Sequence, residues 1–311
     1  MRVFDADQVR ARAPLPELID CLERAFLLGA TVPRRLDLTS NDGPAGRHFL
    51  LMPAIDRDGT SVAKLVTYFP DNPSRGLPTI QAVIVVFSSD GVPLALLDGS
   101  MVTRVRTAAA SALASRYLSR RDSSRLALVG TGALAPWMAV AHATARPIGR
   151  IDVWGRRPER VQATIAAIRE FAAPGIEVFA ATSLEESVRS ADIVTCATSS
   201  ATPLIAGSWL RPGAFVDLVG SFTPAAREAD DEAIRRARIF VDTFEGALTE
   251  AGDLIDPLSR GVITRGQVEG ELSDLVGGRV PGRRGSDEIT LFKSVGTALE
   301  DLAAARLIIQ A

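Results

Sequence analysis

The sequence contains few residues of the kinds that build disulfide frameworks and metal sites. Among 311 residues there are two cysteines, Cys21 and Cys196, and two histidines, His48 and His142. The cysteines are far apart in sequence and suggest no disulfide framework, and neither residue type clusters with metal-ligand spacing. We therefore expect a reduced protein that holds no metal ion.

Long apolar runs and an excess of one charge are also absent. No run approaches the ~18 apolar residues needed to cross a bilayer, and the N-terminal "MRVFDADQVR" lacks the apolar core of a signal peptide. Lys plus Arg number 35 and Asp plus Glu 37, for a formal charge of −2. This balance gives no support to a nucleic-acid or membrane partner. We expect a soluble, cytoplasmic protein, long enough for two domains.

The second half of the chain alternates short apolar strands with helical segments. Such alternation is typical of a parallel sheet covered by helices on both faces. The expected strands are "RLALVG" (125–130), "RIDVWGR" (150–156), "IEVFA" (176–180), "DIVTCAT" (192–198), "AFVDLVG" (214–220) and "RIFVDT" (238–243). The helices expected between them are 135–145, 158–172 and 183–191.

The first hundred residues have a different pattern, with one helical segment followed mainly by strands. The strands and helices expected outside the alternating region are a helical segment over 5–29, strands at 47–55 and 61–70, a hairpin over 79–99, and helices at 103–118 and 288–308. We predict a discontinuous substrate and dimerisation domain of mixed α+β structure, 1–118 with 292–311. A doubly wound, Rossmann-type α/β domain would then occupy 119–291.

A glycine-rich turn, "LALVGTGALAPW", joins the first strand and helix of the predicted parallel sheet. Gly130, Gly132 and Ala135 form the pattern G-x-G-x-x-A in the strand–turn–helix setting of a dinucleotide site. The first glycine permits the turn, the second allows close approach of a pyrophosphate, and the third small residue lets the helix pack closely. The alternative is a packing turn that binds no ligand.

The end of the next strand distinguishes between the two nicotinamide dinucleotides. NAD enzymes usually carry there a carboxylate that binds the ribose 2′-hydroxyl. This sequence has Gly155, Arg156 and Arg157 instead. Guanidinium groups bind a 2′-phosphate with charge-assisted hydrogen bonds, so we predict NADPH in preference to NADH. The alternative is that both arginines are solvated residues at a helix start.

Three cations in the first domain are candidates for binding an anion. Lys64 interrupts an apolar strand, Arg106 opens an apolar helix, and Arg35 lies in "VPRRLDL". A buried ammonium group needs an anion nearby, and Lys64 and Arg106 have no acidic neighbour in the sequence. They favour a site for a carboxylate, although most such residues are surface charges.

Five segments together resemble the ornithine cyclodeaminase/mu-crystallin family, from about Arg35 to the C-terminus. They are "VAKLVTYFPDNPSRGLPTIQA", "LDGSMVTRVRTAAASALASRYL", "VGTGALA", "GSFTPAAREAD" and "DEITLFKSVGTALEDLAAA". The resemblance implies a homodimer built from a substrate and dimerisation domain and a Rossmann domain. It implies that Arg35, Lys64 and Arg106 bind the substrate carboxylate, with Arg34 as the alternative to Arg35.

The resemblance also implies roles in catalysis and cofactor binding. Asp230 matches the acid that transfers a proton, with Glu228 as the alternative, and Lys64 is expected to share in catalysis. Asp230 is equally well placed in the sequence to cap a helix that starts at 231, and the two roles are compatible. Residues expected at the cofactor are Thr79 and Gln81 near the nicotinamide, and Arg106, Thr107, Gly130, Thr131, Gly132, Ala133, Leu134, Gly155, Arg156, Arg157, Ala197 and Thr198.

Two departures from the family pattern bear on the reaction. Leu134 stands where the family often has glutamine, which removes a polar anchor. Leu50 stands where ornithine cyclodeaminases carry an acid for the distal amine, so it disfavours a diamino acid. With the predicted NADPH preference, this favours reduction of Δ1-pyrroline-2-carboxylate or Δ1-piperideine-2-carboxylate by hydride transfer to the imine carbon. Ornithine cyclodeaminase, alanine dehydrogenase and a non-catalytic nucleotide-binding protein remain as alternatives.

Overall fold

The computed structural model describes residues 1–40 and 46–311, and the chain in it divides into two compact units. Unit 1 consists of residues 1–107 and 297–311, and unit 2 of residues 108–296. The division lies inside helix α3 (Gly99–Leu118), whereas the sequence suggested the polar segment that follows this helix. The C-terminal helix α11 (Ala298–Gln310) belongs to unit 1, so that unit is discontinuous.

Unit 1 is built on a six-stranded sheet in the order β1-β6-β5-β4-β3-β2. β1 pairs with β6 in parallel and the other neighbours are antiparallel. The strands are β1 (Arg2–Phe4), β2 (Leu36–Ser40), β3 (Arg47–Ile55), β4 (Ser61–Tyr68), β5 (Ile80–Phe87) and β6 (Pro93–Asp98). Alternate side chains of β4, Val62, Lys64 and Val66, are buried, and α11 packs against β4 and β3. We call this side of the sheet the helix-covered face.

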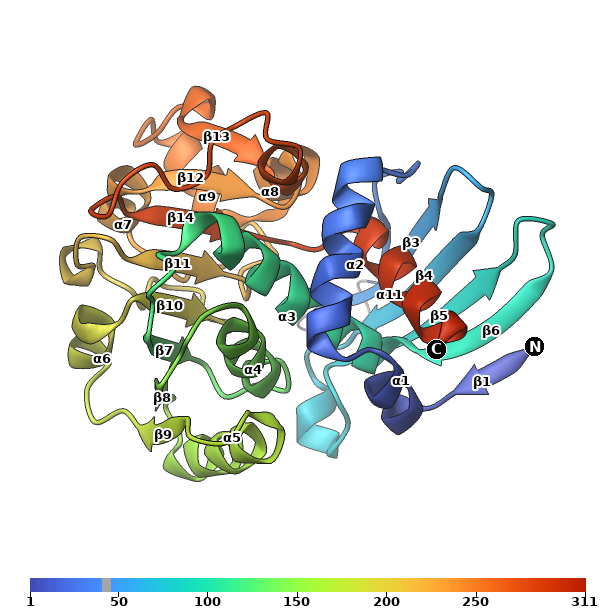
Figure 1. The fold of residues 1–311 in the computed structure, drawn as a ribbon, viewed down its shortest axis with the longest axis horizontal. Helices are drawn as coiled ribbons and strands as arrows, with labels where there is room; N and C mark the ends of the chain where they lie inside the picture. The colour runs from blue at the N-terminus through green and yellow to red at the C-terminus, as the bar shows by residue number, and fades with distance from the viewer. Residues whose placement is uncertain (41–45) are drawn as a thin grey trace. The chain divides into compact units, whose positions relative to one another are not determined.

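The helices of unit 1 follow from local signals in the sequence. Asp5 and Gln8 form a capping box that starts α1 (Ala6–Arg12). The predicted single segment is divided there, because Pro14 disfavours helical geometry at Ala13, and α2 (Leu15–Leu28) follows. In Figure 1, α2 and α11 lie side by side although they stand at opposite ends of the sequence.

Unit 2 contains an eight-stranded sheet in which every described pair is parallel, in the order β13-β12-β14-β11-β10-β7-β8-β9. The strands are β7 (Arg125–Val129), β8 (Arg150–Trp154), β9 (Glu177–Ala180), β10 (Ile193–Cys196), β11 (Phe215–Leu218), β12 (Arg238–Val241), β13 (Val268–Glu271) and β14 (Thr290–Lys293). The predicted doubly wound parallel sheet is confirmed. The strand order reverses between β7 and β10, and α/β proteins bind ligands at such a point.

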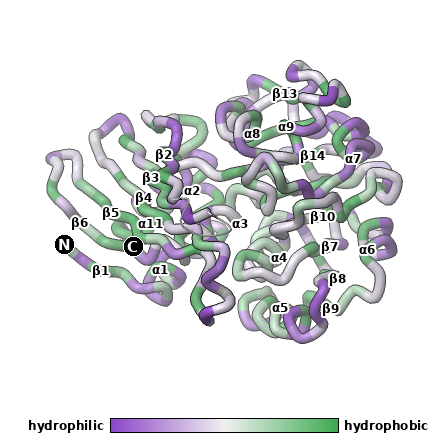
Figure 2. Tube along the Cα trace, turned by 180° about the vertical axis from the view of Figure 1, so that it is seen from behind, coloured by the Kyte–Doolittle hydropathy of each residue, from purple (hydrophilic) through white to green (hydrophobic). Residues whose placement is uncertain are grey.

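Helices connect these strands, as Figure 1 shows for α4 and α5 beside β7, β8 and β9. The helices of unit 2 are α4 (Ala135–Ala145), α5 (Pro158–Phe171), α6 (Leu184–Ser190), α7 (Asp231–Arg236), α8 (Phe244–Glu250), α9 (Gly252–Ser259) and α10 (Leu272–Val276), with short 3-10 turns at Gly207–Trp209 and Arg265–Gln267; unit 1 has one at Asn72–Arg75. The tube in Figure 2 is apolar along β5 and β7; β7 is largely buried, whereas in β5 the buried side chains, Ile84 and Val86, alternate with half-buried ones.

The predicted helix over 288–308 is wrong in its first half. Residues 290–293 form β14, which lies between β11 and β12 with all four side chains buried. A strand buried on both faces reads as a continuous apolar run and cannot be told from a helix by periodicity. Gly296, with φ +84°, ends the extended segment, and the Thr297 side chain caps α11.

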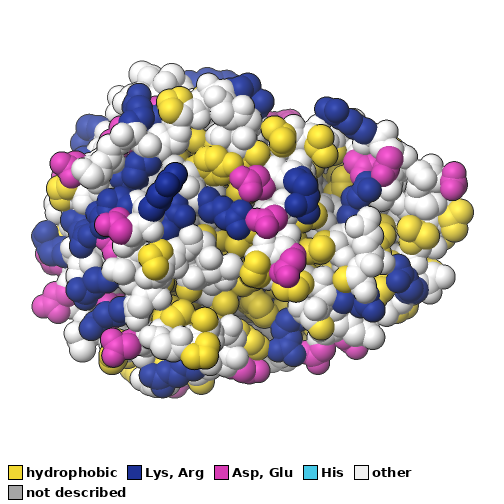
Figure 3. All heavy atoms as spheres, viewed as in Figure 1, with side chains coloured by type: hydrophobic (Ala, Val, Ile, Leu, Met, Phe, Trp, Pro, Cys, Tyr) yellow, Lys and Arg dark blue, Asp and Glu magenta, His cyan; other side chains and the backbone are white. Residues whose placement is uncertain are grey.

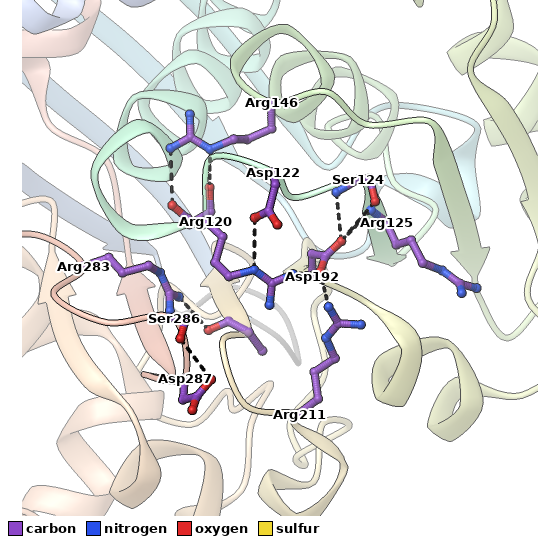
Figure 4. Close-up of polar contacts among 12 residues, drawn as sticks. Arg120, Asp122, Ser124, Arg125, Arg146, Asp192, Arg211, Arg283, Ser286 and Asp287 are labelled. Carbon is purple, nitrogen blue, oxygen red and sulfur yellow. Dashed lines mark hydrogen bonds and ion pairs between the residues drawn. The ribbon is translucent and has the colours of Figure 1, made fainter.

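A cluster of charged residues fixes the start of the parallel sheet. Figure 4 shows Asp192, just before β10, between Arg120 and Arg211, with which it forms ion pairs. Its Oδ2 accepts hydrogen bonds from the backbone N–H groups of Ser124 (2.8 Å) and Arg125 (2.9 Å). Burial opposes its ionisation, but these donors and cations hold the pKa of Asp192 below its usual value.

Charges of both signs are interspersed on the face of the molecule drawn in Figure 3. Within residues 1–40 and 46–311, no helix is long and apolar enough to span a membrane. The same residues contain no group of three or more His, Cys, Asp or Glu side chains arranged to hold a metal ion.

Candidate active site

Lys64 lies at the centre of the helix-covered face of unit 1. In the register of the sheet it stands opposite Met52 of β3 and Ile84 of β5, both of which are buried. Lys64 is 1% exposed, and its Nζ lies 2.6 Å from Oδ2 of Asp301. The lysine that interrupts an apolar strand is therefore a buried, ion-paired group and not a surface charge.

Arg106 is buried beside the same carboxylate. Its Nε donates to Oδ1 of Asp301 at 3.1 Å, and its Nη1 donates to Oε2 of Glu300 at 2.6 Å. Both acids lie in the first turn of α11, about two hundred residues further along the chain. The acidic partners of Lys64 and Arg106 are therefore remote in sequence and adjacent in the fold.

The electrostatics of this cluster depend on burial and on neighbouring charges. Burial, assisted by the charges of Arg106 and Arg35 and opposed by Asp301, lowers the pKa of Lys64 to about 8. Burial alone would raise the pKa of Asp301, but Lys64 and Arg106 hold it below its usual value. Arg35 is half-buried and close enough to act on Lys64, whereas Arg34 is exposed.

Leu50 lies on the same face of the sheet as Lys64. It stands opposite Val66 of β4, two residues from Lys64, and alternate residues of a strand share a face. Gln81 stands opposite Thr67 and is exposed, so alternation puts it on the other face of the sheet. The structure therefore brings Leu50, and not Gln81, to the side of Lys64.

Two further residues expected at the cofactor, Thr79 and Thr107, lie in unit 1. The carbonyl oxygen of Thr79 accepts a hydrogen bond from the N–H of Phe69 at 2.9 Å, and its side chain is half-buried. Thr107 is buried in α3 beside Arg106. These contacts are structural and assign neither residue to a ligand.

The glycine turn of unit 2 connects β7 to α4 and is open beside Gly132. Gly130 has φ +119°, and a Cβ atom there would lie 2.5 Å from the carbonyl oxygen of Ala197. Gly132 is exposed, and a Cβ atom there would meet nothing within 4 Å. No side chain of Leu134 caps the N-terminus of α4. The turn thus lies against the loop after β10, at the reversal of strand order, and faces open space.

The loop after β8 closes against this turn and carries two exposed arginines. A Cβ atom on Gly155 would lie 2.5 Å from Cγ2 of Thr131, so only glycine fits without a shift. Arg156 and Arg157 are exposed, and Arg157 has an ion-pair contact of 3.9 Å with the exposed Glu159. Residues 155–157 contain no carboxylate that would repel a 2′-phosphate.

Glu228 joins the loops that follow β10 and β11. Its Oε1 accepts hydrogen bonds from N (2.8 Å) and Oγ1 (2.9 Å) of Thr198, and its Oε2 from N of Gly220 (2.7 Å) and of Ser221 (3.2 Å). Glu228 is fully buried. Burial raises its pKa to about 7, while Lys293 and the Thr198 donors oppose the increase. The side chain that the sequence offered as an alternative proton donor is therefore held inside the unit.

A second buried ion pair supports this arrangement. Oδ1 of Asp253 accepts hydrogen bonds from N of Glu228 (2.8 Å) and of Ala229 (3.2 Å), and its Oδ2 lies 3.5 Å from Nζ of Lys293. Asp253 and Lys293 are fully buried. This pair and the acids of α11 were not predicted from the sequence. Lys293 and both α11 acids lie in the quoted segment "DEITLFKSVGTALEDLAAA", which was the available signal.

Asp230 caps α7. Its Oδ1 accepts hydrogen bonds from N of Ala233 at 2.8 Å and of Gly207 at 2.9 Å. The capping role weighed from the sequence is thus confirmed. Asp230 itself is only partly buried, unlike Glu228 two residues earlier.

Three comparisons relate this geometry to known proteins. The model of the "Ornithine cyclodeaminase/mu-crystallin family" matches residues 3–311. Over 314 residues the chain is 38% identical to a Delta(1)-pyrroline-2-carboxylate reductase of Colwellia psychrerythraea, covering 100% of this chain and 99% of that protein.

Two solved structures have similar folds over the whole chain. The Thermococcus litoralis Delta(1)-pyrroline-2-carboxylate reductase, in complex with NADH and L-proline, is 33% identical with a TM-score of 0.94, covering 100% of this chain and 97% of that one. An archaeal alanine dehydrogenase dimer with bound NAD is 28% identical with a TM-score of 0.91, covering 100% and 95%.

Proposed function

Because this chain belongs to the ornithine cyclodeaminase/mu-crystallin family, we propose that it reduces Δ1-pyrroline-2-carboxylate to L-proline with a pyridine nucleotide. It is an oxidoreductase that acts on a C=N bond. The observation that carries the proposal is the buried pair of cations, Lys64 and Arg106, in a chain 38% identical to a reductase of that name. The six-membered Δ1-piperideine-2-carboxylate, which would yield L-pipecolate, is the second substrate of the same class.

The cations of unit 1 bind the substrate carboxylate. Arg35, Lys64 and Arg106 contribute three positive charges, and Glu300 and Asp301 contribute two negative ones, so the five groups carry a net charge of +1 when ionised. One carboxylate neutralises that charge. Fixed, charge-assisted donors orient the substrate as well as binding it, and such positioning lowers the barrier to a bimolecular step.

The cofactor is a pyridine nucleotide, and unit 2 has residues that fit it. The loop of Gly130 and Gly132 offers backbone N–H groups and open space to a pyrophosphate. When bound, the reduced nicotinamide supplies the hydride for the imine carbon. Arg156 and Arg157 select NADPH, because exposed guanidinium groups at the end of β8 attract a 2′-phosphate.

The imine nitrogen also needs a proton, and we assign its relay to Asp230. Oδ1 of Asp230 accepts hydrogen bonds from two backbone N–H groups, so we assign transfer of the proton to Oδ2. The variant Asp230→Asn tests this assignment, because asparagine caps a helix as well as aspartate does. We expect kcat to fall at least tenfold at an unchanged melting temperature. Unchanged kcat would restrict Asp230 to the capping role.

Substrate choice depends on the face that carries Lys64. Leu50 is apolar and lies beside Val66, so this face suits the ring carbons of a cyclic imine better than the ammonium group of a diamino acid. A diamino acid would leave its charge against apolar surface, which is costly.

Absorbance at 340 nm tests the function directly. Purified protein is supplied with NADPH or NADH and, in turn, the five-membered imine, the six-membered imine, or pyruvate with ammonia; release of ammonia from L-ornithine is measured with NAD. We expect the highest kcat/KM for a cyclic imine with NADPH. A higher kcat/KM for pyruvate would favour an alanine dehydrogenase, and ammonia release would favour a cyclodeaminase. If no substrate is turned over, the remaining alternative is a non-catalytic nucleotide-binding protein.

The second face of the unit 1 sheet supports assembly as a homodimer. Across all six strands it carries apolar side chains that are exposed or half-buried in the single chain: Val3, Leu36, Leu38, Phe49, Leu51, Ile55, Leu65, Val83, Val85, Phe87, Leu94 and Leu96. An apolar surface of this extent marks an interaction site. The occupant is a second copy of the chain, as the archaeal relative of similar fold is a dimer.

A further inference from the structure

Asp301 is the residue on which both buried cations of unit 1 converge. Its Oδ2 lies 2.6 Å from Nζ of Lys64, and its Oδ1 accepts from Nε of Arg106 at 3.1 Å. It is 0% exposed. It lies one turn into α11, whose start is fixed by Thr297. The carboxylate therefore stands between Lys64 of β4 and Arg106 of α3, on a helix whose start is capped.

We propose that Asp301 is the positioning residue of the carboxylate site: it holds Lys64 and Arg106 in the geometry that receives one carboxylate. This inference rests on the proposed function. Two cations buried side by side repel each other and lose their hydration, which only paired acids offset. With one oxygen on each cation, Asp301 fixes both their separation and their direction. It touches neither substrate nor cofactor in this role.

Glu300 has a different place in this cluster. Its Oε2 accepts a hydrogen bond from Nη1 of Arg106, whereas Nζ of Lys64 forms its ion pair with Asp301. Loss of the Asp301 charge would therefore leave the lysine without its buried counter-ion. The lysine would release its proton more readily, and the site would lose both a donor and a positive charge.

If Asp301 served only to dock α11 on the sheet, other contacts that dock this helix should affect carboxylate binding equally. The same helix is also anchored by Arg306, which forms ion pairs with Asp56 and Asp58 in the turn between β3 and β4. Arg306 lies more than one turn beyond Asp301, and its ion pairs are with the turn between β3 and β4. Arg306→Gln is therefore a matched control that weakens docking of α11 and leaves the carboxylate site intact.

The experiment compares wild type, Asp301→Asn, Asp301→Glu and Arg306→Gln. Calorimetry measures the Kd of pyrrole-2-carboxylate, an unreactive ring carboxylate, in cofactor-free protein, and of NADPH separately. Kinetics gives KM for the imine and its pH dependence. For Asp301→Asn we expect a tenfold or greater rise in the Kd of the carboxylate and in KM for the imine. We also expect a basic limb of kcat/KM at lower pH, and a Kd of NADPH within twofold of wild type.

The controls separate the possible roles. Asp301→Glu retains the negative charge, so we expect a smaller rise in the Kd of the carboxylate than in Asp301→Asn, and a basic limb of kcat/KM near that of wild type. If Asp301→Asn does not fold, Asp301→Glu takes its place in the comparison. Arg306→Gln should keep the wild-type Kd for both ligands. Unchanged carboxylate affinity in both Asp301 variants, or equal losses in Arg306→Gln, would overturn the inference. If wild type reduces no imine but carboxylate binding still depends on Asp301, the proposed function fails and this inference stands.

Discussion

The most direct consequence of a buried Lys64 is that carboxylate affinity should fall in mildly alkaline solution. Its pKa is lowered from 10.5 to about 8. At that value about nine tenths of the lysine is protonated at pH 7, about half at pH 8 and about one tenth at pH 9. If only the ammonium form binds the carboxylate, the apparent Kd should rise about twofold by pH 8 and about tenfold by pH 9.

The assay must separate titration of the enzyme from that of the imine nitrogen. Inhibition by pyrrole-2-carboxylate does so, because its carboxylate is ionised throughout pH 7–9.5. We expect Ki to rise with pH as calculated, and KM for NADPH to change much less. A Ki that stays constant over this range would refute the assignment of Lys64 to carboxylate binding.

The same lysine affects stability with a definite sign. A lysine whose pKa is lower in the folded state binds fewer protons there than in the unfolded chain between pH 8 and 10.5. Burying the charged lysine therefore lowers the free energy of unfolding below pH 8. This destabilisation is lost as the pH rises from 8 to 10.5. The shift from 10.5 to about 8 corresponds to about 3 kcal/mol. Chemical denaturation of wild type and Lys64→Met should diverge in this window, with the wild type gaining stability relative to the variant.

Four further variants test other parts of the structure. Arg156→Ala with Arg157→Ala should raise KM for NADPH about 10-fold or more, the effect of charge-assisted bonds, and leave KM for NADH unchanged; equal effects on both would contradict the cofactor assignment. Gly220→Ala places a Cβ atom 1.9 Å from the carbonyl oxygen of Thr198, so we expect a lower melting temperature and weaker NADPH binding, and a wild-type melting curve would disprove the close approach. Leu50→Glu should weaken imine binding by at least tenfold, measured as KM, by adding a negative charge on the face of Lys64; unchanged KM would remove Leu50 from the site. Leu65→Glu should convert a dimer into a monomer in light scattering, and a dimer that persists would move the interface elsewhere.

The sequence was most informative where local signals and the fold agree. Gly130 stands in a strand–turn–helix pattern that needs glycine, and the structure gives it φ +119° against the loop of Ala197. Asp5 with Gln8, and Asp230 with the helix after it, are capping signals of the same local kind. Each depends on a few consecutive residues, so a single sequence contains the whole signal.

The sequence was least informative where the deciding contact joins remote segments. The sequence indicates that Lys64 and Arg106 are cations in apolar surroundings, but their counter-ion, Asp301, lies near the other end of the chain. β14 was predicted as helix because its burial on both faces depends on β11 and β12, which are not its sequence neighbours. Patterns of period 2 or 3.6 contain no information about such partners.

Both units contain buried acids that hold cations or backbone amides, and this affects how loss of activity should be interpreted. Asp301 pairs with Lys64 in unit 1, and Asp253 pairs with Lys293 in unit 2. Removing one partner of a buried ion pair costs about 3–5 kcal/mol, because the other charge is left uncompensated. An inactive Glu228 or Asp253 variant therefore does not identify a proton donor unless its melting temperature is preserved. Asp230, which is partly exposed and keeps its cap as asparagine, is the acid at which chemistry and folding can be separated by one substitution.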